Sequence, residues 1–535
     1  MPTCTVNGVE VTVESGTNVL EAAQQAGFEV PYFCYHPGLS APANCRACVI
    51  DLGGGRLGPS CYTQTADGAE YHTDTDQVRD FQKANLEFIL LNHPVDCPIC
   101  DKAGECMLQD QYYQFSRRPS RLRVGKTSKP KVVDIGPEVV LDAERCILCT
   151  RCIRVCDEIA GEPQLCIINR GDRSEISVFP GRRLDHPYSL CTVDVCPVGA
   201  LTSKDFRFKA RAWFLTSTHS VCPGCATGCN VYLDHTDGVA RRLTPRHNPD
   251  VNGWWMCDAG RSTYRPVQEE RILVPSTLVD GEVTGATWTD ALSRCADRLN
   301  LAREANGGGA VAVIASPWCT NEDLWMLARF ASECLGTRSV YRGGRPPGEA
   351  DDILRDADKN PNTAGLEAIF AAFDIEVHDL DALLADLQSG AVSAVYQVGG
   401  DLPAPMDLLR ETLQATSDTW RFVVQTSNVC AAAEKAQVVL PAAAWAEVDG
   451  TFTNRDGRVQ RVRAAVPPKG SSRPHWEITG LVAQRMGFDL AVEGPRQLLR
   501  ELAAKVPRFA GVAPESVGPG GVATAPEAGP QATAP

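Results

Sequence analysis

The chain has 535 residues, a formal net charge of −14 at pH 7 and 23 cysteines, and 44% of its residues are hydrophobic. The length predicts several domains, because single hydrophobic cores stop growing below this size. The acidic balance argues against nucleic acid as a partner, since phosphate binding requires a basic surface. We expect a cytoplasmic chain with metal-binding cysteines, because residues 1–6 lack an export signal and no apolar run approaches the roughly 18 residues of a membrane-spanning helix.

Residues 3–13 alternate in polarity, which predicts two strands joined by a tight turn at Asn7-Gly8. A helix should begin near Asn18 and end at Gly27. This order of elements is typical of a small β-grasp ferredoxin. In such a domain, over residues 1–77, four thiolates would hold a [2Fe-2S] cluster, although plant-type ferredoxins have a shorter first gap. These thiolates have the spacing Cys34-x10-Cys45-x2-Cys48-x12-Cys61.

Apolar residues recur at helical spacing from Val78 to Leu91, and they predict an amphipathic helix that ends before His93-Pro94. Three cysteines follow, and the next one after them is Cys146. Three thiolates leave a four-iron cluster one ligand short, and imidazole replaces thiolate in some clusters. We therefore expect residues 78–118 to hold a [4Fe-4S] cluster. Its ligands would be His93, Cys97, Cys100 and Cys106.

Several motifs in the N-terminal half resemble those of one known family. They are Phe33-Cys-Tyr-His-Pro-Gly-Leu39, Asn44-Cys-Arg-Ala-Cys48, Asp96-Cys-Pro-Ile-Cys100 and Cys196-Pro-Val-Gly-Ala-Leu-Thr-Ser203. Together they resemble the large iron–sulfur subunit (G type) of bacterial NADH:quinone oxidoreductase, respiratory complex I. The similarity is close over the N-terminal half and looser over the C-terminal half. Related modules occur in NAD-linked formate dehydrogenases and in iron-only hydrogenases.

A third group, over residues 137–211, resembles a bacterial ferredoxin, in which the cysteine before a proline completes the ligand set of the other cluster. By resemblance to the complex I subunit, this domain holds one [4Fe-4S] cluster. Its ligands would be Cys146, Cys149, Cys152 and Cys196. Cys156 and Cys191 depart from that pattern. Either they serve a second cluster, with Cys166 and with Asp194 or His186, or they are buried free thiols.

A fourth group, over residues 215–271, matches the [4Fe-4S] domain that opens molybdopterin enzymes. Its spacing is Cys222-x2-Cys225-x3-Cys229-x27-Cys257. A structural zinc site is the alternative, because four thiolates also suit tetrahedral zinc. The short gaps are a less natural pairing for a zinc knuckle, so we favour iron.

Strands alternate with helices over residues 272–510, which predicts parallel α/β units. The predicted segments are a strand at 310–316, a helix at 322–335, a strand at 393–398, a helix at 406–415 and strands at 421–425 and 437–440. Segments 441–447 and 449–454 resemble the molybdopterin-oxidoreductase domain as it survives in complex I. Gly399-Gly400 is a weak signal for phosphate binding. Residues 511–535, rich in Pro, Gly and Ala, should be disordered.

The sequence thus predicts a multidomain fold of the α+β and α/β classes. The resemblance implies an electron relay with one [2Fe-2S] and three [4Fe-4S] clusters, the Cys222 group being structural and off the main path. Without a catalytic motif or a Gly-rich dinucleotide fingerprint, we expect NADH and flavin on a partner subunit. The quinone-module subunits would be the other partners, in a peripheral arm on the cytoplasmic face of the inner membrane.

The alternative is the α subunit of a molybdenum formate dehydrogenase. Such an enzyme needs a cysteine or selenocysteine on the metal, and usually a lysine soon after the last cluster cysteine. After Cys257 the chain reads Asp-Ala-Gly-Arg, and residues 340–347 contain no cysteine. We therefore expect no molybdenum and a degenerate C-terminal domain. The four scattered cysteines should be small buried residues: Cys295, Cys319, Cys334 and Cys430.

Overall fold

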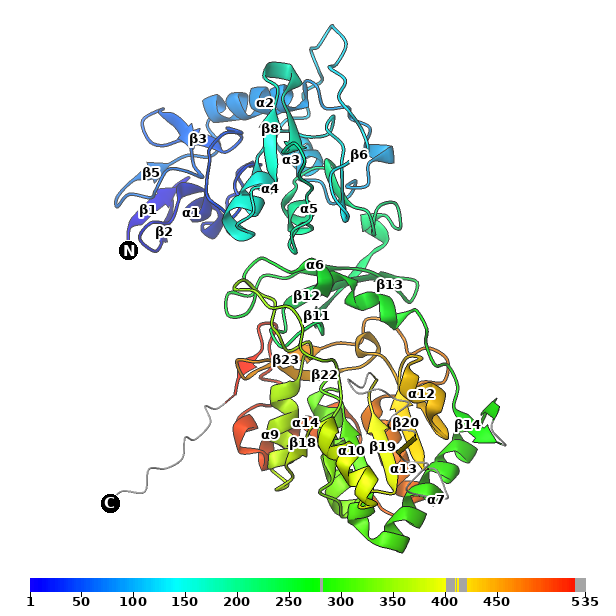
Figure 1. Cartoon of the computed structure of the whole chain (residues 1–535). Coiled ribbons are helices and arrows are strands. Elements are labelled where there is room, and N and C mark those ends of the chain that lie inside the picture. The colour runs from blue at the N-terminus through cyan, green and yellow to red at the C-terminus, as the bar shows by residue number, and fades with distance from the viewer. Residues whose placement is uncertain (280–281, 401–408, 410, 413–420, 525–535) are drawn as a thin grey trace. The chain divides into compact units, whose positions relative to one another are not determined.

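The computed structural model describes residues 1–279, 282–400, 409, 411–412 and 421–524. The chain forms two compact units, Met1–Leu215 and Thr216–Pro535. In Figure 1 the first unit runs from blue to green, and the second continues to red. Every helix in the described ranges is too short or too polar to cross a bilayer.

The first unit begins with the predicted hairpin. β1 (Thr3–Val6) pairs antiparallel with β2 (Val9–Thr12), and β5 (Glu70–Tyr71) joins β1 in parallel. Asn7 and Gly8 both have positive φ, as the tight turn requires. The predicted helix is α1 (Val19–Gln25), whose N-cap is Asn18. The predicted hairpin and the predicted helix are therefore both confirmed.

The rest of the first unit consists of short elements around long loops. α2 (Asp76–Leu90) confirms the helix predicted before His93, and its N-cap is the side chain of Thr75. The other elements are β3 (Val49–Asp51), β4 (Leu57–Pro59), η1 (Cys97–Ile99), α3 (Met107–Phe115), β6 (Val133–Asp134), β7 (Val139–Leu141), α4 (Arg151–Arg154), η2 (Val155–Ile159), β8 (Leu165–Ile168), η3 (Gly171–Arg173), β9 (Glu175–Val178), α5 (Cys191–Val195), β10 (Leu201–Ser203) and η4 (Ala212–Phe214).

One hydrophobic core connects the three cysteine-bearing segments of this unit. It combines Phe33 from the first thiol loop, Leu86 and Leu108 from the helices on either side of the second, and Leu141 and Leu201 from the sheet β10-β7-β6. The three predicted domains therefore pack around a common interior, which fixes their loops relative to one another.

The second unit opens with the antiparallel sheet β11 (Thr216–Val221), β12 (Asn230–Thr236) and β13 (Val239–Pro245). Its larger sheet has the order β15-β14-β21-β20-β19-β16-β17-β18, and the strands from β21 to β18 are parallel. The parallel strands confirm the predicted α/β class. The sheet consists of β14 (Ser276–Val279), β15 (Glu282–Gly285), β16 (Val311–Ala315), β17 (Val340–Arg342), β18 (Val377–His378), β19 (Ala394–Val398), β20 (Phe422–Thr426) and β21 (Val438–Pro441).

Helices and a small sheet surround these strands (Figure 1). The helix predicted at 322–335 is α8 (Asn321–Arg329), continued by η7 (Phe330–Leu335). The helix predicted at 406–415 falls largely outside the described residues. The remaining elements are α6 (Asp258–Arg261), η5 (Ser262–Val267), α7 (Trp288–Asn306), η6 (Gly308–Ala310), α9 (Thr363–Ala371), α10 (Leu380–Ser389), α12 (Ala431–Lys435), η8 (Trp445–Glu447), β22 (Gly450–Thr453), β23 (Arg458–Val462), α13 (His475–Arg485), α14 (Pro495–Lys505), η9 (Pro507–Phe509) and β24 (Val522–Ala523).

The disorder predicted from residue 511 is wrong for residues 511–524. β24 pairs antiparallel with β23, and Val512 and Val517 are buried in the core of the second unit. The composition of this segment is poor in apolar residues, but the few that it has are placed where they pack. Residues 525–535 lie outside the described ranges.

Candidate metal centres

The first group of thiols lies on the loops between α1 and the segment after β4. Cys34, Cys48 and Cys61 are buried and Cys45 is half-buried. The backbone N–H of Cys34 donates to Cys45 Sγ over 3.4 Å. Hydrogen bonds from the thiols of Cys45 and Cys61 lower the pKa of Cys34 to about 2, and a bond from Cys61 lowers that of Cys48. The same bonds raise the pKa of Cys45 and Cys61, so two of the four sulfurs favour the thiolate form, and the bonds among the thiols place all four sulfurs close together.

The second group lies around η1 and the start of α3. Cys100 is buried, whereas Cys97 and Cys106 are half-buried. Burial, with a smaller contribution from the nearby thiols of Cys100 and Cys97, raises the pKa of Cys106 to about 11. The three sulfurs therefore face a common space.

His93 has the environment of a metal ligand. Its Nδ1 is buried and has no hydrogen-bond partner within the described ranges. Burial lowers the pKa of His93 to about 4, so the ring is neutral at pH 7, which is the form that binds metal. Arg145 lies near both His93 and Cys100. A buried, unpartnered nitrogen is costly, so this ring fits the missing fourth ligand.

The third group encloses a small cavity. Cys146, Cys149, Cys152 and Cys196 line it together with apolar side chains such as Leu141. Thr150 between the ligands has a positive φ, and this bend lets the short gaps direct the sulfurs inward. The backbone N–H of Leu148 donates to Cys146 Sγ over 3.4 Å. Burial raises the pKa of Cys149 to about 11. The fold therefore brings Cys196 to the three cysteines that precede it by 44 to 50 residues.

Cys156 and Cys191 are fully buried and lie near each other. Neither of them lines this cavity. The N–H of Tyr188 donates to Nδ1 of His186, so Nε2 carries the proton and donates to Cys156 Sγ over 3.4 Å. Cys166 is half-buried on β8, opposite Ser177. The structure thus groups Cys156 with Cys191 and His186, and a further cluster there stays an open prediction.

The fourth group lies in the second unit, on the turn between β11 and β12 and at the start of α6. All four cysteines are buried: Cys222, Cys225, Cys229 and Cys257. Burial, and after it the other three thiols, raise the pKa of Cys229. Gly260 leaves room between two of the sulfurs, because a Cβ at this position would lie 3.0 Å from Cys222 Sγ and 3.4 Å from Cys257 Sγ.

Zinc and an iron–sulfur cluster need different spacings of their ligands. Among the described residues, no three His, Cys, Asp or Glu side chains converge closely enough to hold a single metal ion. A structural zinc site needs four ligands at about 2.3 Å from one centre. In an iron–sulfur cluster the thiolates bind different irons, so their sulfurs lie further apart.

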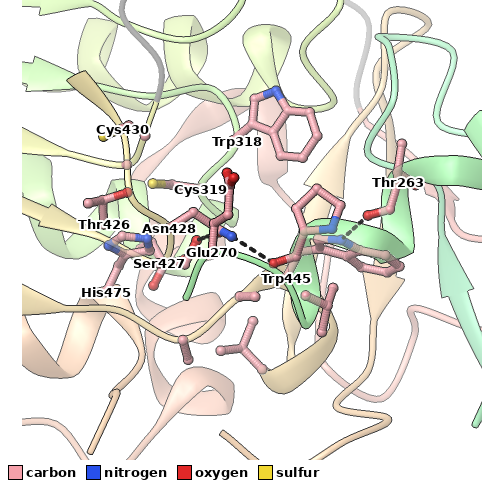
Figure 2. Close-up of a pocket in the computed structure, with 18 of the residues that line it drawn as sticks. Thr263, Glu270, Trp318, Cys319, Thr426, Ser427, Asn428, Cys430, Trp445 and His475 are labelled. Carbon is pink, nitrogen blue, oxygen red and sulfur yellow. Dashed lines mark hydrogen bonds between the residues drawn. The ribbon is translucent and has the colours of Figure 1, made fainter. Parts of the chain in front are cut away.

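The second unit also has a pocket that the sequence did not predict (Figure 2). It lies at the carboxyl ends of β16 and β19, where the strand order reverses and where open α/β sheets bind ligands. Cys319 and Cys430, which the sequence treats as scattered residues, both line it. Gly399 lines it too, but a Cβ there would lie 2.3 Å from that of Ser316, so close packing explains this glycine.

The charges of this pocket argue against phosphate. Among the described residues that line it, Glu269, Glu270 and Asp323 outnumber the one arginine, Arg345. Trp445 Nε1 donates to the carbonyl of Thr263 over 3.2 Å, which holds one wall in place (Figure 2). The pocket combines seven separate segments of the chain, and for that reason no local motif indicated it.

Five family models match the chain. They are a 2Fe-2S iron-sulfur cluster binding domain at residues 1–76, the NADH-ubiquinone oxidoreductase-G iron-sulfur binding region at 82–121, the ferredoxin-like domain of NADH-quinone oxidoreductase subunit 3 at 136–202, the molybdopterin oxidoreductase Fe4S4 domain at 215–269 and molybdopterin oxidoreductase at 370–485. These matches confirm the predicted kinds of domain. The individual ligands and the boundaries stay predictions.

Several curated relatives of this chain share the same name. The G subunit of NADH-quinone oxidoreductase from Streptomyces coelicolor is 37% identical over 358 residues, which cover 66% of this chain and 42% of the relative. The chain is a homologue of the NADH-quinone oxidoreductase G subunit. The same protein of Mycobacterium bovis is 35% identical over 418 residues, which cover 77% of this chain and 49% of the relative. The chain thus spans just under half the length of these curated relatives.

A solved structure, NAD+-reducing [NiFe]-hydrogenase in the H2-reduced state, is also similar. It is 29% identical with a TM-score of 0.36, and the match covers 39% of this chain and 90% of that chain.

Proposed function

We propose that this chain is the electron-relay subunit of an NADH-quinone oxidoreductase, carrying electrons from a flavin-bearing, NADH-oxidising subunit toward quinone. When bound, iron–sulfur clusters would supply the one-electron carriers. The observation that carries the proposal is that three ligand sets of the first unit touch one another through their own loops. A relay needs ligand loops that are held at fixed, short separations from one another, and hydrogen bonds between the loops hold them in this way.

The His93 set and the Cys146 set are in direct contact. The N–H of Met107, next to Cys106, donates to the carbonyl of Pro197 over 3.1 Å. Arg145, next to Cys146, donates to both carboxylate oxygens of Asp96, at 2.6 and 3.0 Å. The two ligand loops therefore hold each other in place through backbone and side-chain bonds.

The Cys34 set is tied to the same centre. Nη2 of Arg154 donates to the carbonyl of Cys34 over 2.5 Å and to that of Cys149 over 3.4 Å. From α2, Asn85 Nδ2 donates to the carbonyl of Cys45 over 3.0 Å. One buried arginine thus bridges the first and third ligand sets.

The proposed cofactors are one [2Fe-2S] cluster on the Cys34 set and three [4Fe-4S] clusters on the His93, Cys146 and Cys222 sets. The Cys222 set belongs to the second unit and would be structural. The partners would be the flavin-bearing subunit and the quinone-module subunits, in a peripheral arm on the cytoplasmic face of the inner membrane. The names of the relatives, which are subunits of an NADH-quinone oxidoreductase, support a place in a multi-subunit complex.

A molybdenum formate dehydrogenase α subunit is the second candidate. The pocket of Figure 2 favours it, because the pocket lies partly in the segment that matches molybdopterin oxidoreductase. Formate-dependent dye reduction by the purified chain would establish it, and the relay account expects none.

Replacing Cys149 with Ala in the assembled enzyme tests the relay. We expect NADH-to-quinone electron transfer to be lost, because one of the four sulfurs around the third site is gone. NADH oxidation by an artificial acceptor at the flavin should persist. Unchanged quinone reduction would contradict the proposal.

A further inference from the structure

Two buried arginines of α4 have no acidic partner in the part of the chain that the structure describes. Arg151 and Arg154 are 4% and 7% exposed. Arg151 donates to the carbonyls of Val195, over 3.1 Å, and Tyr35. In the described ranges no carboxylate oxygen lies within 4.0 Å of either guanidinium group, and the buried Nε atoms of both have no partner.

Two other arginines with buried side chains are paired with carboxylates, whereas Arg246 bonds the side chain of Asn230 and the carbonyl of Pro519. Arg145 Nη2 lies 2.6 Å from Asp96, and Arg271 Nη1 lies 2.6 Å from Glu447. A guanidinium group stays charged in a protein, and a buried charge without a counter-ion is strongly unfavourable. Because no described carboxylate is paired with Arg151 or Arg154, we expect another negatively charged group to balance their buried charges.

Neighbouring side chains do not supply that charge. Arg154 also donates to the carbonyl of Ser40, whose N–H and hydroxyl bind Glu158, but Glu158 is exposed to solvent. Burial and the two guanidinium charges lower the pKa of His36 to about 4, so this ring is neutral at pH 7.

The two arginines instead face the ligand sets. Arg154 bonds the carbonyls of Cys34 and Cys149. Arg151 bonds Val195, next to Cys196, and its Nη1 lies 3.6 Å from the sulfur of Met107, next to Cys106. All three ligand sets of the first unit therefore have a loop in contact with this pair.

We propose that Arg151 and Arg154 are the counter-ions of the anionic clusters held by the Cys34 and Cys146 sets and raise the reduction potentials of those clusters. This inference rests on the ligand sets of the proposed function. A thiolate-bound cluster gains one negative charge with each electron, and a buried cation nearby stabilises that charge because the low dielectric screens it little. The pair are positioning residues that tune the relay.

The test compares variants of the full chain by redox titration followed by electron paramagnetic resonance. Arg151→Gln and Arg154→Gln remove one charge each but keep a hydrogen-bond donor, and both should shift the potential of the Cys146-set cluster to more negative values. Arg154→Gln should shift the Cys34-set cluster as well. Arg151→Lys and Arg154→Lys keep the charge and should stay close to the native potential.

Arg46→Gln is the matched control. Arg46 lies between the ligands Cys45 and Cys48 but is exposed, so solvent screens its charge and we expect a much smaller shift. If a Gln variant fails to assemble its cluster, bound iron retained by the Lys variant and lost by the Gln variant supports the same role.

Two results would overturn the inference: native potentials in the Gln variants, or equal shifts in the Gln and Lys variants. A native chain that shows no cluster signals at all would instead refute the proposed function, so the two failures are distinguishable.

Discussion

At Gly199 two ligand sets meet with no space between them. A Cβ at this position would lie 2.3 Å from Cys100 Sγ and 3.3 Å from the Cβ of Lys102. Gly199 follows the ligand Cys196 by three residues, whereas Cys100 belongs to the His93 set. The absence of a side chain therefore brings the loops of two proposed clusters into contact.

Replacing Gly199 with Ala should separate these loops. We expect a loss of about 1–3 kcal/mol in stability from overpacking, and a loss of iron from the His93 set as Cys100 is displaced. Gly125→Ala is the control, because a Cβ there meets no atom within 4 Å. Iron content and thermal unfolding of the two variants measure the effect; equal iron in both would show that Cys100 tolerates the methyl group.

The sequence predicts the local part of the sites and misses the long-range part. The spacing of Cys146, Cys149 and Cys152 is a property of one loop, so it is readable in the chain. The arginines Arg151 and Arg154 look like ordinary solvated residues in the sequence. Only the fold shows that both are buried without an acid, because their acceptors lie more than forty residues away or in other loops.

Among the elements, β24 shows how little apolar content suffices for packing. This strand pairs with β23, and the segment before it buries Val512 and Val517 next to α14. Helices with a clear apolar period, such as α2, were predictable within two residues. The segment of β24 has no such period, and it is ordered by tertiary contacts alone.

Truncation after residue 510 should destabilise the second unit. Two buried valines contribute roughly 3 kcal/mol or more, and the pairing with β23 adds to this. A chain that ends after residue 524 keeps these contacts and is the control. Thermal unfolding should give a lower Tm for the shorter chain only; identical values would mean that residues 511–524 do not pack in solution.

At the scale of the whole molecule, the first unit is one body with three proposed redox sites. The sequence divides it into domains 1–77, 78–118 and 137–211, but a single hydrophobic core connects all three segments. Sequence patterns report each segment separately, because the contacts between segments are made by residues far apart in the chain. The shared core is what makes a relay physically plausible here, since it fixes the positions of the ligand loops.

The most direct test of the account is the iron, acid-labile sulfide and molybdenum content of the anaerobically purified protein. One two-iron and three four-iron clusters predict about 14 iron atoms per chain, matching sulfide and no molybdenum. About 18 iron atoms would contradict this count and place a further cluster at Cys156 and Cys191. Stoichiometric molybdenum, or a colourless protein that contains zinc, would contradict the relay itself.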